Sequence, residues 1–281
     1  MVDSKKKGNF YIFLTALLWS TGGVLIKFAP GNPIAINGAR SIIAFLFFWA
    51  YRRNIRLHFN KIIITAACCL TLTNTLFVAA NKLTTAANAI VLQYMAPIFV
   101  LLWDSIYRKK VPSKKQIGIV AMAFGGMVLF FMDQLDGGRM LGNILAVAAG
   151  LCFSGVFFLN SLPESCSEDS SMLAFFLSFL ISIPFLGDVK NMNMSGLGAI
   201  AVLGIFQVGL AYVLFSKGSK LTSPVSASLI GLLEALLSPL WVLIFYGEKM
   251  GRFALAGAAV ILAAVILNIM LSSETNQKNK G

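Results

Sequence analysis

The fold is decided by a stretch that occurs twice: Lys82-Leu83-Thr84-Thr85-Ala86-Ala87-Asn88-Ala89 returns 138 positions later as Lys220-Leu221-Thr222-Ser223-Pro224-Val225-Ser226-Ala227. Each copy ends one strongly apolar segment and begins the next. The match continues without a gap, so that Met95-Ala96-Pro97 corresponds to Leu233-Glu234-Ala235. The first apolar segments also match, with Trp19-Ser20 corresponding to Phe153-Ser154. These matches predict a duplicated membrane protein.

The composition of the chain is typical of a membrane protein. Of its 281 residues, 58% are hydrophobic and 12% are charged, and the mean hydropathy is +0.81. A soluble domain usually carries about 25% charge, and a bilayer span needs about 20 apolar residues, a length that recurs along this sequence. The net charge of +12 would also suit a nucleic-acid-binding protein, but the basic residues cluster in short gaps between apolar runs. We therefore expect a lipid bilayer as partner and no nucleic acid.

The apolar runs predict ten transmembrane helices, because lipid cannot satisfy the backbone groups of an open strand. They are residues 9–28, 33–51, 61–81, 86–107, 114–132, 140–160, 170–187, 195–217, 225–246 and 251–271. Residues 1–135 form the first repeat and residues 136–281 the second, and an odd number of spans in each turns the second repeat upside down. We expect an all-α integral membrane protein with ten transmembrane helices in two inverted five-helix repeats. Inverted repeats around a site near the midplane recur in secondary transporters.

The basic residues orient the bundle by the positive-inside rule. With the N-terminus inside, the cytoplasmic residues are Lys5, Lys6, Lys7, Arg52, Arg53, Arg56, Lys61, Arg108, Lys109, Lys110, Lys114 and Lys115, and the outer ones are Lys27, Lys82 and Arg139. The three N-terminal lysines also resemble the start of a signal peptide, but no small-residue cleavage site follows, so we expect a retained first span. We predict a multi-pass protein of the cytoplasmic membrane with both termini cytoplasmic and a disordered tail at residues 272–281.

Two segments carry a resemblance to a known family. Thr84-Thr85-Ala86-Ala87-Asn88-Ala89-Ile90-Val91-Leu92-Gln93-Tyr94-Met95-Ala96-Pro97 resembles the fourth-span signature of the EamA branch of the drug/metabolite transporter superfamily. Leu233-Glu234-Ala235-Leu236-Leu237-Ser238-Pro239-Leu240-Trp241, leading to Gly247-Glu248, resembles the ninth-span signature. The resemblance implies ten helices in two inverted halves, a central cavity, and export of amino acids or other small organic metabolites. The sequence departs from the family pattern at Ala235 (often Pro), at Ser238 (often Asn), and at Lys110, the counterpart of Glu248.

Glu234 is the strongest candidate for a functional residue, because a carboxylate near the centre of a span is costly unless it is paired, protonated or facing water. The functional hypotheses are proton coupling and contact with a substrate ammonium group. The structural alternative is a hydrogen bond to a neighbouring helix.

Prolines mark the fourth and ninth spans as candidates for the binding region. Pro97 removes one amide donor and frees a carbonyl one turn back, which predicts that the carbonyl and side chain of Gln93 face a cavity together with Tyr94. Pro239 suggests the same for the ninth span, where Ser238 is a further candidate lining residue. A kink that only shapes packing is the alternative.

Further candidates are polar or aromatic residues within the apolar runs. Trp19 and its counterpart Phe153 suit a wall that grips an apolar group or a cation, with Ser20 beside it. Intramembrane polar groups commonly bond neighbouring helices, and as possible cavity lining we name Asn74, Gln207 and Tyr212. The pair Gly22-Gly23 permits close packing and would allow the first span to bend during gating.

Other charged residues fit structural roles better. Arg40 is expected to extend outward or to pair with a carboxylate or a loop carbonyl, and Asp104 and Glu248 are expected at the interface. Lys82 and Lys220 lie at turns on opposite faces, where they cap helix ends or make a gate contact. The single histidine, His58, is expected to be a solvated loop residue.

The sequence favours a secondary active transporter that moves amino acids or similar metabolites, with export as the favoured direction, by alternating access and with proton coupling as an option. The alternatives are a passive channel or facilitator and a transporter of organic cations. No phosphate loop, metal-ligand spacing or nucleophile motif occurs, so we expect no enzyme activity, cofactor or metal. The four cysteines, Cys68, Cys69, Cys152 and Cys166, show no pairing pattern and are expected to be buried, inert thiols. Ten spans are enough for a monomer to enclose a cavity, and the sequence does not exclude a dimer.

Overall fold

The computed structural model describes residues 2–53, 57–135, 139–246 and 251–278, and every regular element in these ranges is helical. Single helices form the second, third, fifth, sixth and tenth spans: α3 Pro33–Arg52, α4 Lys61–Leu83, α7 Lys114–Phe130, α8 Met140–Ser161 and α14 Arg252–Lys278. The other spans are interrupted. They are α1 Val2–Ser20 with α2 Gly22–Lys27, α5 Ala86–Gln93 with α6 Ala96–Arg108, α9 Ser167–Ser182 with the 3-10 segment η2 Ile183–Asn191, α10 Met194–Val202 with the π-helical η3 Leu203–Leu210 and α11 Ala211–Ser219, and α12 Pro224–Gly231 with α13 Leu233–Tyr246.

The ten predicted helices are confirmed. Nine spans in the described ranges have the length and hydropathy needed to cross a bilayer. The remaining one, α7, has 17 residues, at the lower end of the range for a span, and the 3-10 turn η1 Met132–Gln134 follows it. The prediction of a disordered tail is wrong up to Lys278, because α14 continues to that residue. Each residue added to an existing helix gains a hydrogen bond without a new nucleation cost.

The repeated sequence stretch forms the same turn in both halves. Thr85 caps α5 by accepting from the amide of Asn88 at 3.2 Å, and Ser223 caps α12 by accepting from the amide of Ser226 at 3.1 Å. Such caps satisfy amide donors that a helix start leaves unpaired. The repeat is therefore a pair of helix-stop and helix-start signals on opposite faces of the bundle.

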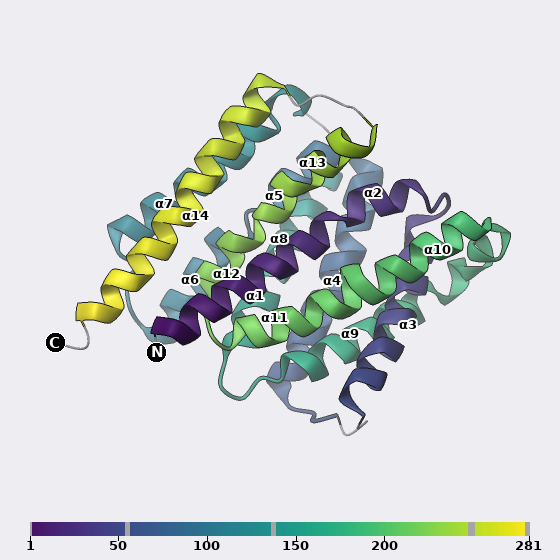
Figure 1. The fold of residues 1–281 in the computed structure, drawn as a ribbon, viewed down its shortest axis with the longest axis horizontal. Helices are drawn as coiled ribbons and strands as arrows, with labels where there is room; N and C mark the ends of the chain where they lie inside the picture. The colour runs from purple at the N-terminus through teal and green to yellow at the C-terminus, as the bar shows by residue number, and fades with distance from the viewer. Residues whose placement is uncertain (1, 54–56, 136–138, 247–250, 279–281) are drawn as a thin grey trace.

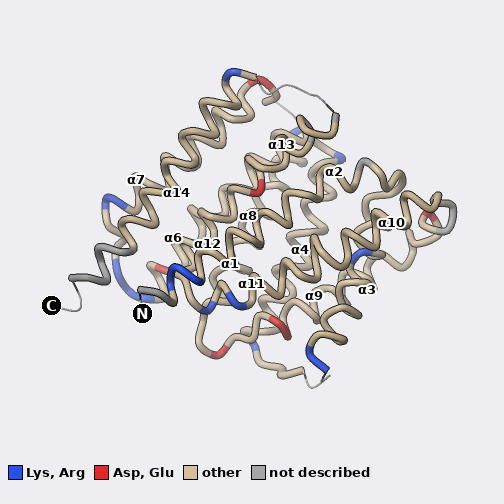
Figure 2. The backbone as a smooth tube through the Cα atoms, in the orientation of Figure 1, with Lys and Arg blue, Asp and Glu red and all other residues tan. Residues whose placement is uncertain are grey.

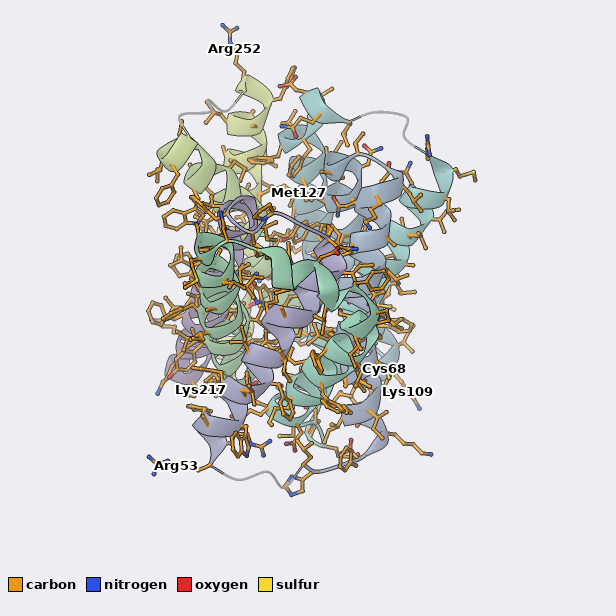
Figure 3. The ribbon with its side chains drawn as sticks, turned by 90° about the vertical axis from the view of Figure 1, so that its right-hand side faces the viewer. Arg53, Cys68, Lys109, Met127, Lys217 and Arg252 are labelled. Carbon is orange, nitrogen blue, oxygen red and sulfur yellow. The ribbon has the colours of Figure 1, made fainter. Side chains whose placement is uncertain are left out.

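We call the two ends of the bundle the terminal face and the opposite face. The terminal face carries the N-terminal end of α1 and the helix ends at Arg52, Lys61, Arg108 and Lys114. The chain ends N and C lie on this side in Figure 1, and Figure 2 shows lysines and arginines gathered near it. Arg53, Lys109 and Lys217 project at one end of the molecule and Arg252 at the other (Figure 3).

The two repeats interlock rather than stand apart. The first span packs against α11, α12 and α13 of the second repeat, and α8 packs against α4, α5 and α6 of the first. Two equivalent hydrogen bonds mark this exchange: the Trp241 indole donates to the Ser20 hydroxyl at 2.9 Å, and the Trp103 indole donates to the Ser154 hydroxyl at 3.0 Å. The fold is thus ten transmembrane helices in two inverted five-helix repeats, each holding the first span of the other.

The fifth and tenth spans, α7 and α14, form a pair at the edge of the bundle (Figure 1). Their contact depends on Gly126 and Gly257. A Cβ atom added at Gly257 would lie 2.4 Å from the backbone nitrogen of Phe130 and 2.6 Å from the Gly126 carbonyl oxygen. Small residues of this kind let helices approach closely in lipid.

We predict that Gly257→Ala destabilises the protein by about 1–3 kcal/mol, because the new methyl group meets backbone atoms that cannot rotate away. Thermal unfolding of purified protein in detergent measures this change. The matched control is Gly125→Ala, since a Cβ atom at Gly125 has no heavy atom within 4 Å. Equal melting temperatures for the two variants would contradict the proposed packing.

Candidate functional site

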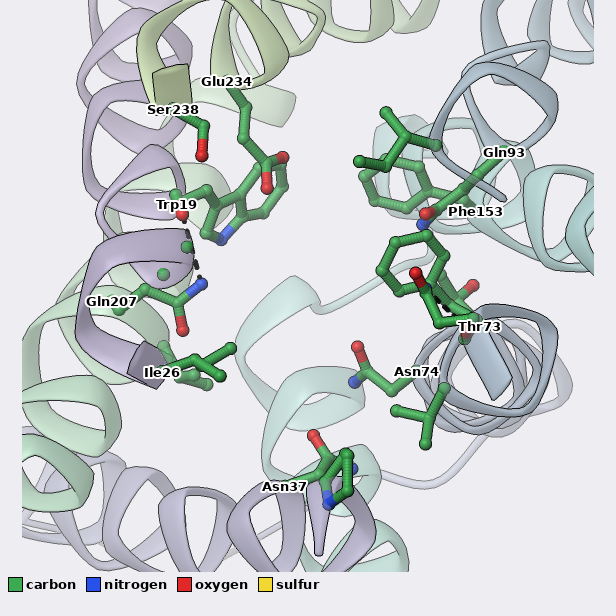
Figure 4. Close-up of a pocket in the computed structure, with 18 of the residues that line it drawn as sticks. Trp19, Ile26, Asn37, Thr73, Asn74, Gln93, Phe153, Gln207, Glu234 and Ser238 are labelled. Atoms are coloured by element: carbon green, nitrogen blue, oxygen red, sulfur yellow. Dashed lines mark hydrogen bonds between the residues drawn. The ribbon is translucent and has the colours of Figure 1, made fainter. Parts of the chain in front are cut away.

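A cavity of about 570 Å³ lies between the two repeats. In Figure 4, Trp19, Ile26, Gln207, Glu234 and Ser238 form one wall, and Thr73, Asn74, Gln93 and Phe153 form the other. The first wall comes from the first, eighth and ninth spans, and the second from the third, fourth and sixth. Eleven of the predicted site residues line this cavity: Trp19, Gly22, Gly23, Asn74, Gln93, Tyr94, Gln207, Tyr212, Glu234, Ser238 and Pro239.

The cavity reaches the opposite face. Its lining includes Ile26 near the end of α2, Pro33 at the start of α3, Lys82 near the end of α4, and Phe131 just after α7. All four lie at helix ends on that face. The cavity is therefore a vestibule that extends from this face into the bundle.

The fourth and ninth spans break at equivalent positions beside the cavity. Between α5 and α6, the amide of Met95 bonds the Leu92 carbonyl at 3.3 Å, and between α12 and α13 the amide of Leu232 bonds the Leu229 carbonyl at 3.2 Å. Both are tighter, three-residue turns in place of α-helical ones. Pro97 begins α6 as predicted, whereas Pro239 lies inside α13, seven residues past the second break. The expectation of a break at Pro239 is wrong, because the turn at Leu232 makes it.

Glu234 lies in the first turn of α13 and faces the cavity. The Tyr94 hydroxyl interacts electrostatically with its carboxylate, and this interaction links the two broken spans across the site. The positive end of the helix dipole also favours a negative charge at this position. The sequence predicted Glu234 and Tyr94 separately as lining residues, and the structure places both on the same cavity.

The position of Arg40 differs most from its prediction. Its side chain neither extends outward nor pairs with a carboxylate within hydrogen-bonding distance: it lines the cavity. Its Nη2 donates to the Asn37 amide oxygen at 2.8 Å and its Nη1 donates to the Gln207 amide oxygen at 3.1 Å. Arg40 also interacts electrostatically with Glu234. One neutral amide on the same helix and one on the eighth span satisfy the guanidinium inside the bundle, so the side chain does not extend outward.

An aromatic cluster forms the floor of the cavity. The Trp19 ring lies 5.3 Å from that of Tyr212 and 5.9 Å from that of Phe153, centroid to centroid. Phe157 and Phe215 extend the cluster toward the terminal face, and both are fully buried. Aromatic faces of this kind suit apolar groups and cations.

Close helix contacts shape the cavity at glycines. A Cβ atom at Gly22 would lie 3.0 Å from the Gln207 amide nitrogen, and one at Gly23 would lie 2.7 Å from the Ser238 hydroxyl. The first span is interrupted beside this pair, since α1 ends at Ser20 and α2 begins at Gly22. Bending of the span during gating stays a prediction. Because Gly22 and Gly23 lack side chains, the side chains of Gln207 and Ser238 can pack closely against the first span here.

The Gln93 carbonyl does not face the cavity as predicted. A Cβ atom at Gly150 of α8 would lie 2.7 Å from that carbonyl oxygen, so the freed group points at α8. The Gln93 side chain does line the cavity. The proline-loosened turn therefore serves helix packing on one side and the cavity on the other.

Two predicted site residues lie outside the cavity lining, Ser20 and Pro97. The Ser20 hydroxyl donates to the Leu17 carbonyl at 2.7 Å and accepts from Trp241, so both its bonding directions serve the helix contact. Pro97 is buried at the start of α6. Ser20 holds the two repeats together, and Pro97 shapes the broken span.

Several lining residues were missed, and their common signal was polarity within an apolar run. The clearest is Asn37, one helical turn before Arg40 and on the same face. Thr73 and Asn81 carry the same signal.

The terminal face is closed by polar contacts between the repeats. Arg52 pairs with Asp169, whose side chain is fully buried, and with Glu168 at 3.4 Å. The Asn60 amide donates to the Glu164 carbonyl at 2.7 Å. His58 is exposed as predicted, but it also contacts Asp169, with Nδ1 3.2 Å from a carboxylate oxygen. These contacts seal the side of the bundle away from the vestibule.

The remaining predicted residues fall outside the site. Asp104 pairs with Arg108 at 2.7 Å near the end of α6, and Glu248 lies outside the described residues. All four cysteines are free, and Cys68 is exposed on α4, which corrects the expectation that these thiols are buried. In the described ranges, no cluster of three or more His, Cys, Asp and Glu residues has the arrangement of a metal site.

Comparison with known proteins agrees with this architecture. Relatives include YwfM of Bacillus subtilis (strain 168), named an uncharacterized transporter, which is 25% identical over 98% of this chain and 97% of its own length. An uncharacterized transporter of Archaeoglobus fulgidus is 26% identical over 92% of this chain and 95% of its own. YicL of Salmonella typhimurium, an uncharacterized inner membrane transporter, is 22% identical over 95% and 96%.

The fold and the family are matched along nearly the whole chain. One solved crystal structure superimposes with a TM-score of 0.81 at 18% identity, covering 96% of this chain and 99% of that one. The sequence profile of the EamA-like transporter family matches residues 6–132 and 140–270. This multi-pass membrane protein therefore belongs to the EamA-like transporter family.

Proposed function

We propose that the chain is a secondary transporter for amino acids or similar small zwitterionic metabolites, working by alternating access across the cytoplasmic membrane. The observation that carries this proposal is the placement of Arg40 and Glu234 on one cavity of about 570 Å³. A cavity of this volume suits a small organic molecule. The family membership supports transport, and the residues in the cavity support the substrate class.

Arg40 has the donors to bind a substrate carboxylate. A guanidinium carries five N–H groups, and three of its hydrogen bonds go to amide oxygens of Asn37 and Gln207. Two N–H groups are left for a ligand, enough for a paired contact with a carboxylate. The surrounding amides fix the guanidinium plane before the substrate arrives.

Glu234 and the aromatic floor would receive the other end of the substrate. The carboxylate of Glu234 suits an ammonium group, and Trp19, Tyr212 and Phe153 offer aromatic faces to a side chain. A substrate that bridges Arg40 and Glu234 would also connect the second and ninth spans.

The orientation proposed for the bundle places both termini in the cytoplasm, because the basic helix ends gather on the terminal face (Figure 2). The vestibule then opens outward and the contacts of Arg52 and Asp169 close the cytoplasmic side. This is the outward-open state of an exporter after substrate release. Export as the net direction follows the family resemblance and the cellular gradient.

The moving units proposed here differ from the two sequence repeats, residues 1–135 and 136–281. Each cavity wall combines spans of both repeats, as the interlocked packing requires. We propose that the wall of the first, eighth and ninth spans rocks against the wall of the third, fourth and sixth. The interrupted first, fourth and ninth spans supply bends for this motion.

Two alternatives are separable by experiment. A passive channel is disfavoured by the buried aromatic floor beneath the vestibule, and its exchange of labelled for unlabelled substrate would not saturate. A transporter of organic cations is supported by Glu234 and the aromatic rings but opposed by the positive charge of Arg40. Cations without a carboxylate would then bind better than amino acids.

We expect Arg40→Gln to weaken binding of amino acids by about 10–100-fold, because a hydrogen bond to a charged group contributes about 1.5–3 kcal/mol. Thermal-shift titration of purified protein against amino acids, amines and quaternary ammonium compounds measures the loss. The control is Arg53→Gln, an exposed arginine on the terminal face. Retained affinity in the Arg40 variant would exclude carboxylate recognition by this residue.

Glu234→Gln is expected to abolish transport, or its dependence on a proton gradient, while the protein still inserts and folds. The reason is that the amide keeps the shape but neither carries a proton nor attracts an ammonium group. Proteoliposome uptake with and without a pH gradient measures both effects. The exposed Glu164→Gln is the control, and unchanged uptake and pH response in Glu234→Gln would remove this residue from the mechanism.

A further inference from the structure

Lys220 makes a compact three-point contact at the terminal face. Its Nζ donates to the Leu162 carbonyl at 2.8 Å, the Ser165 carbonyl at 2.7 Å and the Ser165 hydroxyl at 2.6 Å. Leu162 is the C-cap of α8, so its carbonyl belongs to the negative end of that helix dipole. Three acceptors match the three donors of an ammonium group.

This contact joins the two walls of the cavity. Lys220 begins the turn between α11 and α12, which pack against the first span. Leu162 and Ser165 lie in the loop that leaves α8, and α8 belongs to the other wall. The Ser167 and Ser219 hydroxyls meet beside the contact at 3.2 Å. Lys220 therefore fastens one wall to the other below the aromatic floor.

Lys82 is the counterpart of Lys220 in the first repeat, at the same turn on the opposite face. It lines the open vestibule, and no hydrogen bond or ion pair connects it to the described part of the chain. The two lysines occupy equivalent positions in the two repeats, but within the described residues the side chain of Lys220 is hydrogen-bonded and that of Lys82 is not. One holds a closed face, and the other stands in an open one.

The first repeat contains the matching acceptor loop. α8 ends at Ser161 and α9 begins at Ser167, and in the first repeat α2 ends at Lys27 and α3 begins at Pro33 with the same spacing. The match of Trp19 to Phe153, carried forward without a gap, sets Phe28 against Leu162 and Gly31 against Ser165. Phe28 is the C-cap of α2, just as Leu162 is the C-cap of α8.

We propose that Lys220 and Lys82 are alternating latches: Lys220 holds the terminal face closed in this state, and in the reverse state it releases while Lys82 binds the carbonyls of Phe28 and Gly31. The proposal rests on the alternating access proposed above and adds the residues that fasten each face. It requires no movement of charge into the cavity. Each face is locked by a lysine from one wall on a helix end of the other.

The chemistry of the contact suits a reversible latch. Its acceptors are neutral, so release leaves no buried counter-charge behind, unlike the opening of an ion pair. Partial burial beside these acceptors lowers the pKa of Lys220, while the rest of its side chain stays exposed. Regained hydration offsets the lost hydrogen bonds when the latch opens.

The test measures water access at both faces of protein in nanodiscs with a membrane-impermeant maleimide. Cys166, as the single cysteine, reports on the terminal face, since it lies next to Ser165 and burial raises the pKa of its thiol. Ile26→Cys in a cysteine-free background reports on the vestibule. Both reporters are combined with Lys220→Met, Lys82→Met and the control Lys217→Met, a lysine on α11 that lies over the Tyr51 ring.

Lys220→Met is expected to label Cys166 at least several-fold faster and Ile26→Cys several-fold slower than the parent, because the open terminal face and the open vestibule exclude each other. Lys82→Met is expected to leave Cys166 protected and Ile26→Cys reactive, while Lys217→Met changes neither. Faster labelling of Cys166 without slower labelling at Ile26→Cys would show that Lys220 only caps the end of α8. That result would overturn the latch. Unchanged rates at both reporters would overturn it as well.

Two further arms keep the outcome interpretable. If Lys220→Met is not monodisperse, Ser165→Ala removes one acceptor and is expected to shift both reporters in the same directions by a smaller factor; no shift overturns the latch. Labelling needs no substrate. A reciprocal shift in a protein that transports nothing would therefore refute the proposed function alone, and transport with no shift would refute the latch alone.

Discussion

The structure depends on one constraint: inside a bilayer, every backbone amide and carbonyl needs a partner within the protein. Unbroken helices meet this requirement alone, whereas a broken helix must find other partners or face water. The breaks near Tyr94 and Leu232 lie beside the cavity, and the first span bends at Gly22 where the Gln207 side chain approaches. The first, fourth and ninth spans are thus irregular at the places where a polar ligand could be bound.

Much of this arrangement could be predicted from the sequence, because hydropathy and the repeat report directly on the bilayer. Ten spans and their inverted order follow from these two signals, and several lining residues follow from polar groups within apolar runs, as Glu234 and Gln207 illustrate. The rest depends on helix rotation and partner choice, which no spacing reveals. Arg40 turned inward because Asn37 and Gln207 accept from it, and Ser20 turned away because Trp241 donates to it.

The two repeats share the contacts that hold the helices together, but they differ in residues that line the cavity. The Trp–Ser bonds, the Thr85 and Ser223 caps and the two midspan turns occur in both repeats. The cavity carboxylate does not, since Glu234 corresponds to Ala96 in the first repeat. Duplication supplied two equivalent frames, and later substitutions in one frame gave the cavity its polarity. Selectivity can therefore change without disturbing the helix contacts.

The interlocked first spans have a consequence for biosynthesis. Ser20 bonds a tryptophan of the ninth span, which leaves the ribosome more than two hundred residues later. The first span must therefore wait in the bilayer, with its small and polar face uncovered, until almost the whole chain has been inserted. Neither repeat can complete its packing alone. Packing of the first span is therefore completed late. A chain truncated before the ninth span would leave the small and polar face of the first span exposed to the quality-control machinery of the membrane.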